Sequence, residues 1–137
     1  ELGSKSPMTD EIAAAMTAGT AQYLLSGGGI GVSPGQVSLD FSISDHHPLV
    51  SLVSMIAPSP DWFVGVADLP LLQNDQWVDT LTVDLRGWDA GTDDGVTYIA
   101  SNAPATPHVP IFRLESGPFL VAGQVPVLGT FKFVRQE

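Results

Sequence analysis

The sequence contains no cysteine, so no disulfide stabilises the fold and thiols give no clue to the redox compartment. Basic residues are also scarce: five Lys and Arg stand against fifteen Asp and Glu, a formal net charge of −10. A field of this sign repels phosphate backbones, so we expect no nucleic-acid partner, and contact with an anionic membrane only through a bridging cation. No run of about eighteen apolar residues occurs, which argues against a membrane-spanning helix.

What the chain does have is suited to a small β-rich domain. Its 137 residues are 44% hydrophobic, enough for the core of a single domain spanning residues 1–137. Eleven prolines and fourteen glycines are typical of short strands joined by many turns. The sequence opens at Glu1 without a methionine. We therefore expect that a leader or a further domain has been removed.

The order of hydrophobic patterns predicts one helix followed by an antiparallel β-sandwich. Pro7, Asp10 and Glu11 favour a helix start, and the helix is predicted over about residues 8–25. The sandwich is predicted over about residues 36–135, with a loop at 68–76 and the strand at 49–56 buried on much of both faces. In all, the pattern predicts an all-β fold with about eight strands, at 37–43, 49–56, 62–66, 77–85, 96–99, 111–114, 119–124 and 130–134.

A glycine-rich acidic loop from Trp88 to Gly95 is the most distinctive stretch. It carries Asp89, Asp93 and Asp94, and carboxylates that close repel one another unless a proton, a base or a metal relieves the repulsion. Calcium takes oxygen ligands and suits such a loop. The alternative is that Asp89 and Asp93 only make local Asx-turns or contact Arg86.

Two long motifs in this chain resemble the spondin domain of the F-spondin and mindin family. The first runs from Ser51 to Val66 and contains Pro58-Ser59-Pro60-Asp61-Trp62, and the second is Trp88-Asp89-Ala90-Gly91-Thr92-Asp93. The resemblance implies a β-sandwich with a Ca²⁺ ion held by loops at one end. It also implies the metal ligands, namely Asp61, Asp89, Asp93 and, on the preceding strand, Asp40.

The resemblance further implies a secreted or cell-surface protein of the extracellular matrix that acts in adhesion. Animal members carry cysteines before the position of Trp77, where this chain has residues 71–75 without one. The resemblance therefore names no receptor, and the partner is expected to be a protein or glycan surface ligand of unidentified type.

Two other functions compete with a calcium-binding, non-catalytic adhesion or recognition module. One is a calcium-dependent phospholipid-binding module, and the other is a metal-dependent hydrolase. No nucleophile elbow, phosphate loop or nucleotide fingerprint occurs, so no catalytic or cofactor-binding residue is predicted. The pair His46-His47 is interpreted as a solvated turn, because adjacent residues on an extended chain point to opposite faces. Tryptophans 62, 77 and 88 are interpreted as packing residues.

Overall fold

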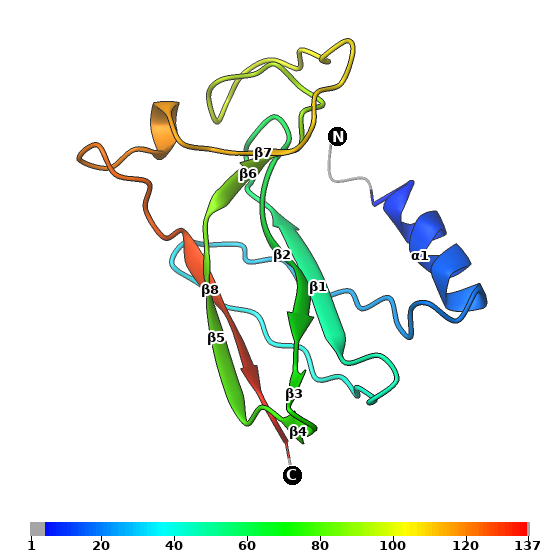
Figure 1. Cartoon of the computed structure of the whole chain (residues 1–137). Coiled ribbons are helices and arrows are strands. Elements are labelled where there is room, and N and C mark those ends of the chain that lie inside the picture. The colour runs from blue at the N-terminus through cyan, green and yellow to red at the C-terminus, as the bar shows by residue number, and fades with distance from the viewer. Residues whose placement is uncertain (1–4, 137) are drawn as a thin grey trace. The chain divides into compact units, whose positions relative to one another are not determined.

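The structure, a computed structural model, describes residues 5–136, and these fall into two compact units (Figure 1). One unit contains residues 5–48 and the other contains residues 49–136. Within the described residues there are eight strands, all paired antiparallel, one short N-terminal helix and no closed barrel. The prediction of an all-β antiparallel fold with a short N-terminal helix is confirmed.

In the unit of residues 5–48, the helix α1 (Met8–Thr17) is shorter than predicted. It begins after Pro7 and has Asp10 and Glu11 in its first turn, where acidic groups complement the helix dipole. Gly19 follows with φ +74°, a left-handed conformation that ends a helix. The predicted continuation to residue 25 is therefore wrong, because the chain turns at the glycine before the later apolar residues are reached.

The strand predicted at 37–43 is also wrong, since this segment is neither helix nor strand. Its apolar residues Val37, Leu39 and Phe41 are all exposed. Alternation gives a strand only where a neighbour supplies ladder hydrogen bonds and a surface covers the apolar face. Among the described residues, 37–43 belong to no strand or bridge, and the next bridge joins Ser44 and His47 around a turn.

The main sheet of the unit of residues 49–136 has four strands in the order β1-β2-β6-β7. These are β1 (Leu49–Met55), β2 (Trp62–Pro70), β6 (Gly87–Asp89) and β7 (Phe112–Arg113). The prediction that the strand at 49–56 is buried on much of both faces is wrong: β1 lies at the edge of the sheet, and Leu49, Val53 and Met55 are exposed. A hydrophobic run alone does not distinguish an edge strand from a central one.

The segment predicted as a loop at 68–76 contains more order than expected. β2 runs on to Pro70, and a small hairpin of β3 (Leu72–Gln73) and β4 (Gln76–Trp77) follows. Asn74 and Asp75 at its tip both have positive φ, 51° and 61°. Two consecutive positive φ angles characterise the tight turns whose twist matches a hairpin, and Asn and Asp adopt them more readily than most residues.

The remaining pair joins β5 (Thr80–Leu85) to β8 (Gly129–Val134), from Thr80 opposite Val134 to Leu85 opposite Gly129. Two other predicted strands are wrong. Residues 96–99 form a bend and turn, and 119–124 begin in the short 3₁₀ helix η1 (Gly117–Phe119) and end in a turn closed by Val121 and Gln124. Ala122 and Gly123 in that turn have positive φ, which no strand accommodates.

The buried core beneath the sheet is small and aromatic. Trp62 and Phe119 are each 2% exposed and pack with Leu114 and Ile56. The rings of Trp62 and Phe119 meet edge to face with centroids 4.7 Å apart, and the ring of Tyr98 lies 5.3 Å from Trp62. Trp62 is therefore a core residue, as the sequence indicated, and it immediately follows Asp61.

Candidate functional site

Strand pairing brings Asp61 and Asp89 to the same end of the main sheet. Asp61 directly precedes β2, and Trp62 is paired across the sheet with Asp89, the last residue of β6. Ser59 fixes the corner, because its hydroxyl accepts a hydrogen bond from the Trp62 backbone N–H at 3.2 Å. The Ala90 backbone N–H donates to the Asp61 carbonyl at 3.3 Å. Two motifs far apart in sequence thus meet at one place.

Asp93 is added by a long loop between β6 and β7 that closes on itself. The Val109 N–H donates to the Gly91 carbonyl at 3.0 Å, the Ala105 N–H to the Thr92 carbonyl at 2.9 Å, and the Asp94 N–H to the Ala103 carbonyl at 2.8 Å. Gly91 has φ +74°, and a Cβ there would overlap the Val109 carbonyl oxygen. Glycine is therefore required where the two sides of the loop come together.

Backbone and side-chain donors surround the Asp61 carboxylate on one side only. Its Oδ2 accepts from the Thr92 N–H at 2.6 Å, from the Thr92 hydroxyl at 2.9 Å and from the Asp93 N–H at 3.0 Å. Its Oδ1 is buried and has no hydrogen-bond partner. A buried carboxylate oxygen without a partner is costly, because such oxygens normally accept at least one hydrogen bond.

The other two carboxylates are held by both of their oxygens. Asp89 accepts from the Gly91 N–H at 2.7 Å and from the Trp62 indole Nε1–H at 3.0 Å. Asp93 accepts from the Gly95 N–H at 2.7 Å and from the Ala103 N–H at 2.8 Å. The three side chains belong to residues that are 8%, 7% and 4% exposed for Asp61, Asp89 and Asp93. They are oriented by short bonds, chiefly to the backbone.

Burial raises the pKa of the Asp89 carboxyl above its ordinary value, and the neighbouring Asp61 and Asp93 carboxylates raise it further. The Gly91 N–H and the Trp62 indole N–H act in the opposite direction, since they stabilise the charged form. The three aspartates therefore interact as charges as well as lying near each other. This is the repulsion that the acidic loop suggested.

An open cavity of about 240 Å³ lies beside the cluster. Asp89, Asp93 and Asp94 contribute its acidic lining, and the remainder comes from small and apolar residues: Gly91, Gly95, Val96, Val109 and Phe112. Carboxylate oxygens next to an open cavity are hard donors of the kind that calcium prefers. Asp94 is exposed and was not among the predicted ligands.

The residues present fit a hard cation in chemistry, although their carboxylates are not arranged as a metal site. Among residues 5–136, no group of three or more His, Cys, Asp or Glu side chains is so arranged. Most of the carboxylate oxygens are directed at N–H groups, as described above. The unpartnered Oδ1 of Asp61 is the atom that a cation would satisfy. The ligand roles of Asp61, Asp89 and Asp93 stay predictions.

The Spondin_N family model matches residues 1–119. The chain belongs to the spondin family. Human Spondin-2 is 42% identical over 82 residues, which is 60% of this chain and 25% of that protein. Spondin-1 of Gallus gallus is 45% identical over 80 residues, 58% of this chain and 10% of that protein.

This spondin chain therefore spans a quarter or less of the length of these two relatives. Spondin-1 and Spondin-2 are secreted proteins of the extracellular matrix, and the expected extracellular location of this chain is confirmed. Within residues 5–136, no helix is both long and apolar enough to cross a membrane.

The remaining predicted ligand, Asp40, belongs to the unit of residues 5–48. It is exposed and lies in a segment without regular secondary structure, where a strand had been predicted. The strand argument that supported Asp40 is therefore lost. Its role as a ligand stays a prediction that rests on the spondin resemblance.

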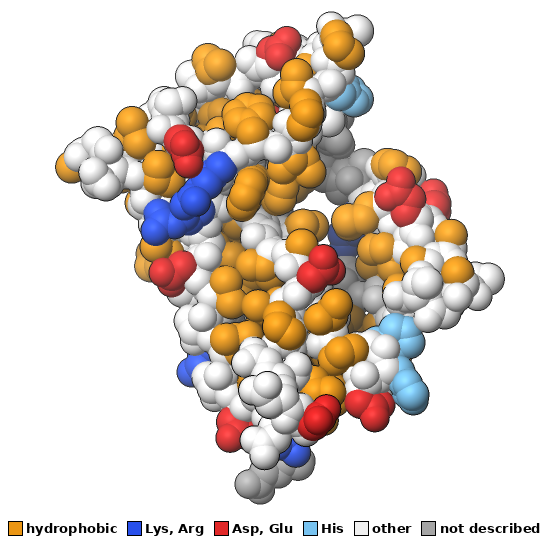
Figure 2. Space-filling view, viewed as in Figure 1, with side chains coloured by type: hydrophobic (Ala, Val, Ile, Leu, Met, Phe, Trp, Pro, Cys, Tyr) orange, Lys and Arg blue, Asp and Glu red, His pale blue; other side chains and the backbone are white. Residues whose placement is uncertain are grey.

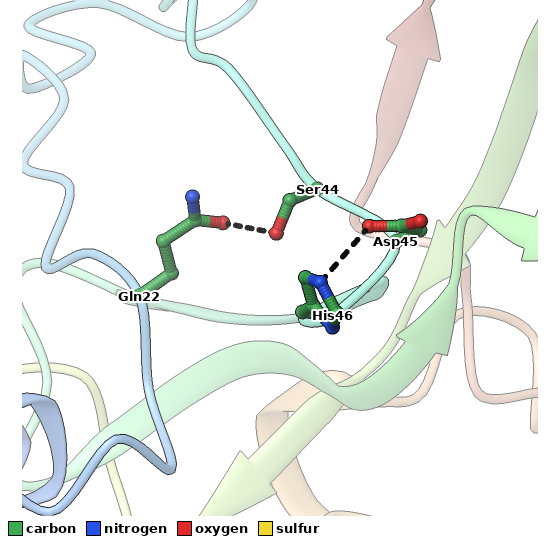
Figure 3. A network of polar contacts seen from close by, with 4 residues as sticks. All are labelled: Gln22, Ser44, Asp45 and His46. Atoms are coloured by element: carbon green, nitrogen blue, oxygen red, sulfur yellow. Dashed lines mark hydrogen bonds and ion pairs between the residues drawn. The ribbon is translucent and has the colours of Figure 1, made fainter.

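His46 lies in an exposed turn of the same unit, as predicted (Figure 3), and the half-buried His47 stands at the bridge that closes this turn. The His46 side chain is 88% exposed, and its Nε2 lies 3.9 Å from Oδ1 of the exposed Asp45. His47 instead places its Nε2 3.0 Å from the Gly19 carbonyl oxygen. Nearby, the Ser44 hydroxyl donates to Oε1 of Gln22 at 3.1 Å. His46 and His47 thus make separate contacts.

Sequence reasoning missed two residues that shape the acidic cluster of this spondin domain. Thr92 donates twice to Asp61, and the Trp62 indole donates to Asp89. Both residues lie inside the quoted motifs, immediately beside a predicted ligand. Their position next to the aspartates was the available signal, but only the paired strands show that each reaches across to the other motif's aspartate.

Proposed function

We propose that this spondin domain is a non-catalytic, calcium-binding adhesion or recognition module of the extracellular matrix. Membership of the spondin family supports the extracellular role. Calcium binding is supported chiefly by the buried Oδ1 of Asp61, which has no hydrogen-bond partner. A divalent cation would satisfy this oxygen.

Charge balance supports the same proposal. The donors to Asp61 and Asp89 described above are backbone N–H groups, a hydroxyl and an indole N–H, all of them neutral. Neutral donors orient carboxylates but do not cancel their charge. The raised pKa of Asp89 is the electrostatic consequence of burial beside two like charges. A bound Ca²⁺ would cancel this negative charge and lower the raised pKa of Asp89, and its ligands would be Asp61, Asp89 and Asp93.

Isothermal calorimetry with CaCl₂ on the whole chain tests the calcium site. For an extracellular module with one open site, we expect a dissociation constant of about 10⁻⁴ to 10⁻³ M. Asp61→Asn and Asp89→Asn should each abolish the heat of binding, because an amide keeps the shape but removes the charge. Asp84→Asn, on the exposed face of β5, is the matched control and should bind as the native chain does.

The native chain and the control must melt at a higher temperature in calcium than in chelator. If native, control and both site variants melt alike in the two buffers, the calcium proposal fails. The non-catalytic part is tested separately. Metal-dependent turnover on a panel of esters and glycosides that Asp89→Asn abolishes would instead favour the hydrolase.

A further inference from the structure

Asp94 differs from the other aspartates of the acidic loop because its carboxylate is not held. Asp89 and Asp93 are buried, and hydrogen bonds engage both oxygens of each carboxylate. Asp94 is exposed and lines the cavity, and within the described residues its carboxylate makes no hydrogen bond or ion pair. Figure 2 shows single acidic side chains, not an acidic patch, on the viewed face at this end of the main sheet. The Asp94 side chain can therefore turn toward its own backbone.

The residue that follows Asp94 is a glycine, and Asp94-Gly95 is the one Asp-Gly pair in the sequence. In such a pair the backbone nitrogen of the glycine can attack the carboxyl carbon of the aspartate, because the glycine has no side chain in the way and the least restricted backbone. Residues 94–96 belong to no helix or strand. Asp94 is therefore the aspartate of this chain that is most open to this reaction.

A hydrogen bond in the folded loop restrains the attacking nitrogen. The Gly95 N–H donates to Oδ1 of Asp93 at 2.7 Å. The Asp93 carboxylate is fixed in turn by the Ala103 N–H, which donates to its Oδ2 at 2.8 Å. Hydrogen bonds to a charged acceptor are short and stronger than those between neutral groups. While the bond to Asp93 lasts, the Gly95 nitrogen keeps its proton and is not available to Asp94.

We propose that Asp94 isomerises spontaneously to isoaspartate, and that the hydrogen bond from Gly95 to Asp93 limits the rate. When the loop opens locally, the Gly95 nitrogen bonds to Cγ of Asp94. The amide proton, one carboxyl oxygen and a solvent proton leave as water, and a cyclic succinimide remains. Water then adds to the main-chain carbonyl carbon of Asp94 and breaks its bond to the Gly95 nitrogen, so the chain continues through Cγ. No metal takes part, and the inference is independent of the calcium site.

Isomerisation changes the geometry of the acidic loop without changing its charge. It adds an atom to the main chain between the N–H groups of Asp94 and Gly95. The first of these is bonded to the Ala103 carbonyl and the second to Asp93. Gly95 has no room to move aside, since even a Cβ there would stand 2.6 Å from Cγ of Pro60. At least one of the two bonds must therefore break, and Asp93 loses its fixed orientation.

Ageing of the whole chain in chelator, at neutral pH and body temperature, tests this inference. Methylation by protein isoaspartate methyltransferase measures isoaspartate, and peptide mapping locates it. The native chain should accumulate it slowly at residue 94. Asp93→Ala should do so at least about tenfold faster, because it removes a hydrogen bond to a charged acceptor. Asp94→Glu is the control and should show none at this position, since its longer side chain would have to close a larger ring.

Two further samples separate the bond to Asp93 from a general loosening of the loop. Asp93→Asn keeps an Oδ1 that can accept from the Gly95 N–H, but its NH₂ group cannot accept from the Ala103 N–H. This variant should therefore age nearly as slowly as the native chain. In denaturant, the native chain and Asp93→Ala should isomerise equally fast at residue 94, because only the folded chain has the bond.

Three results would overturn the inference. One is isoaspartate at residue 94 in the denatured chain but none in the aged native chain. The others are Asp93→Ala ageing no faster than native, and Asp93→Asn ageing as fast as Asp93→Ala. The aged native chain should also melt at a lower temperature than the fresh chain, whereas Asp94→Glu should melt alike before and after ageing. Equal melting of isomerised and fresh native chain would contradict the predicted loss of loop geometry.

Discussion

The indole N–H of Trp62 donates a hydrogen bond to Oδ2 of Asp89 at 3.0 Å, across the ladder that pairs β2 with β6. The same tryptophan is 2% exposed and packs against Phe119. One side chain therefore joins the hydrophobic core to the acidic cluster. A substitution at this position that disturbs the core should therefore also disturb the carboxylates.

Trp62→Phe tests this connection. We expect it to lower the free energy of unfolding by about 2–4 kcal/mol, because it removes a hydrogen bond to a buried carboxylate and leaves a gap in the core. The pKa of Asp89 should also rise further, since the indole N–H lowers it. Trp88→Phe, one residue before Asp89 and only half-buried, is the control and should cost less. Urea denaturation measures the free energy of unfolding of both variants. Equal losses of this free energy in the two would contradict the special role of Trp62.

Gly91→Ala should destabilise the loop far more than an ordinary glycine substitution. Gly91 and Gly123 have nearly the same φ, +74° and +76°, but only at Gly91 would a Cβ overlap the Val109 carbonyl. We expect Gly123→Ala to cost about 1–2 kcal/mol from backbone strain alone. Gly91→Ala should cost clearly more and weaken calcium binding. Thermal unfolding of the two variants compares them, and similar melting temperatures would show that the loop can open without loss.

Calcium at a few millimolar should stabilise the native chain by about 1–2 kcal/mol, as mass action gives for a site of the affinity expected here. Denaturant titrations with calcium and with chelator measure this difference.

Asp40→Asn tests the least supported ligand: if Asp40 contributes to the site, the calcium-dependent part of the stability should fall. If the variant keeps the full difference, Asp40 is not a ligand.

The raised pKa of Asp89 predicts a pH dependence in the presence of chelator. The folded chain binds this proton more tightly than the unfolded chain, so the associated stability is present below the ordinary value of 3.8 and is lost as pH rises through the folded pKa. We expect the free energy of unfolding of the native chain, minus that of Asp89→Asn, to fall across this window. If this difference instead rises with pH, the hydrogen-bond donors lower the pKa of Asp89 more than burial and repulsion raise it.

Several features of this site were predictable from sequence because the motifs are local. The rigid corner Pro58-Ser59-Pro60 delivers Asp61, and the glycines at 91 and 95 shape the loop that holds Asp93. Which oxygen each donor reaches was not predictable. The bond from Thr92 to Asp61 depends on the pairing of β2 with β6, which joins residues about thirty positions apart.

The strand errors have a related cause. Val37, Leu39 and Phe41 alternate as a strand should, yet the structure places residues 37–43 in no strand, because β-structure depends on the surrounding sheet more than on the residues of one segment. The strand predicted at 96–99 is wrong for a different reason, which involves Tyr98. Its neighbours Val96 and Ile99 suggested a strand, but one edge of the tyrosine ring packs on Trp62 while the residue stays 36% exposed, and the flanking residues are more exposed still.

The loop between Gly91 and Val109 closes on itself through its own hydrogen bonds and has two parts. Its base, tied by the bonds from Val109 to Gly91 and from Ala105 to Thr92, holds the acidic groups, whereas its tip around Ile99 lies beyond those ties. Changes of length or composition at the tip leave the base intact. Substitutions can therefore accumulate at the tip while the acidic base keeps its geometry.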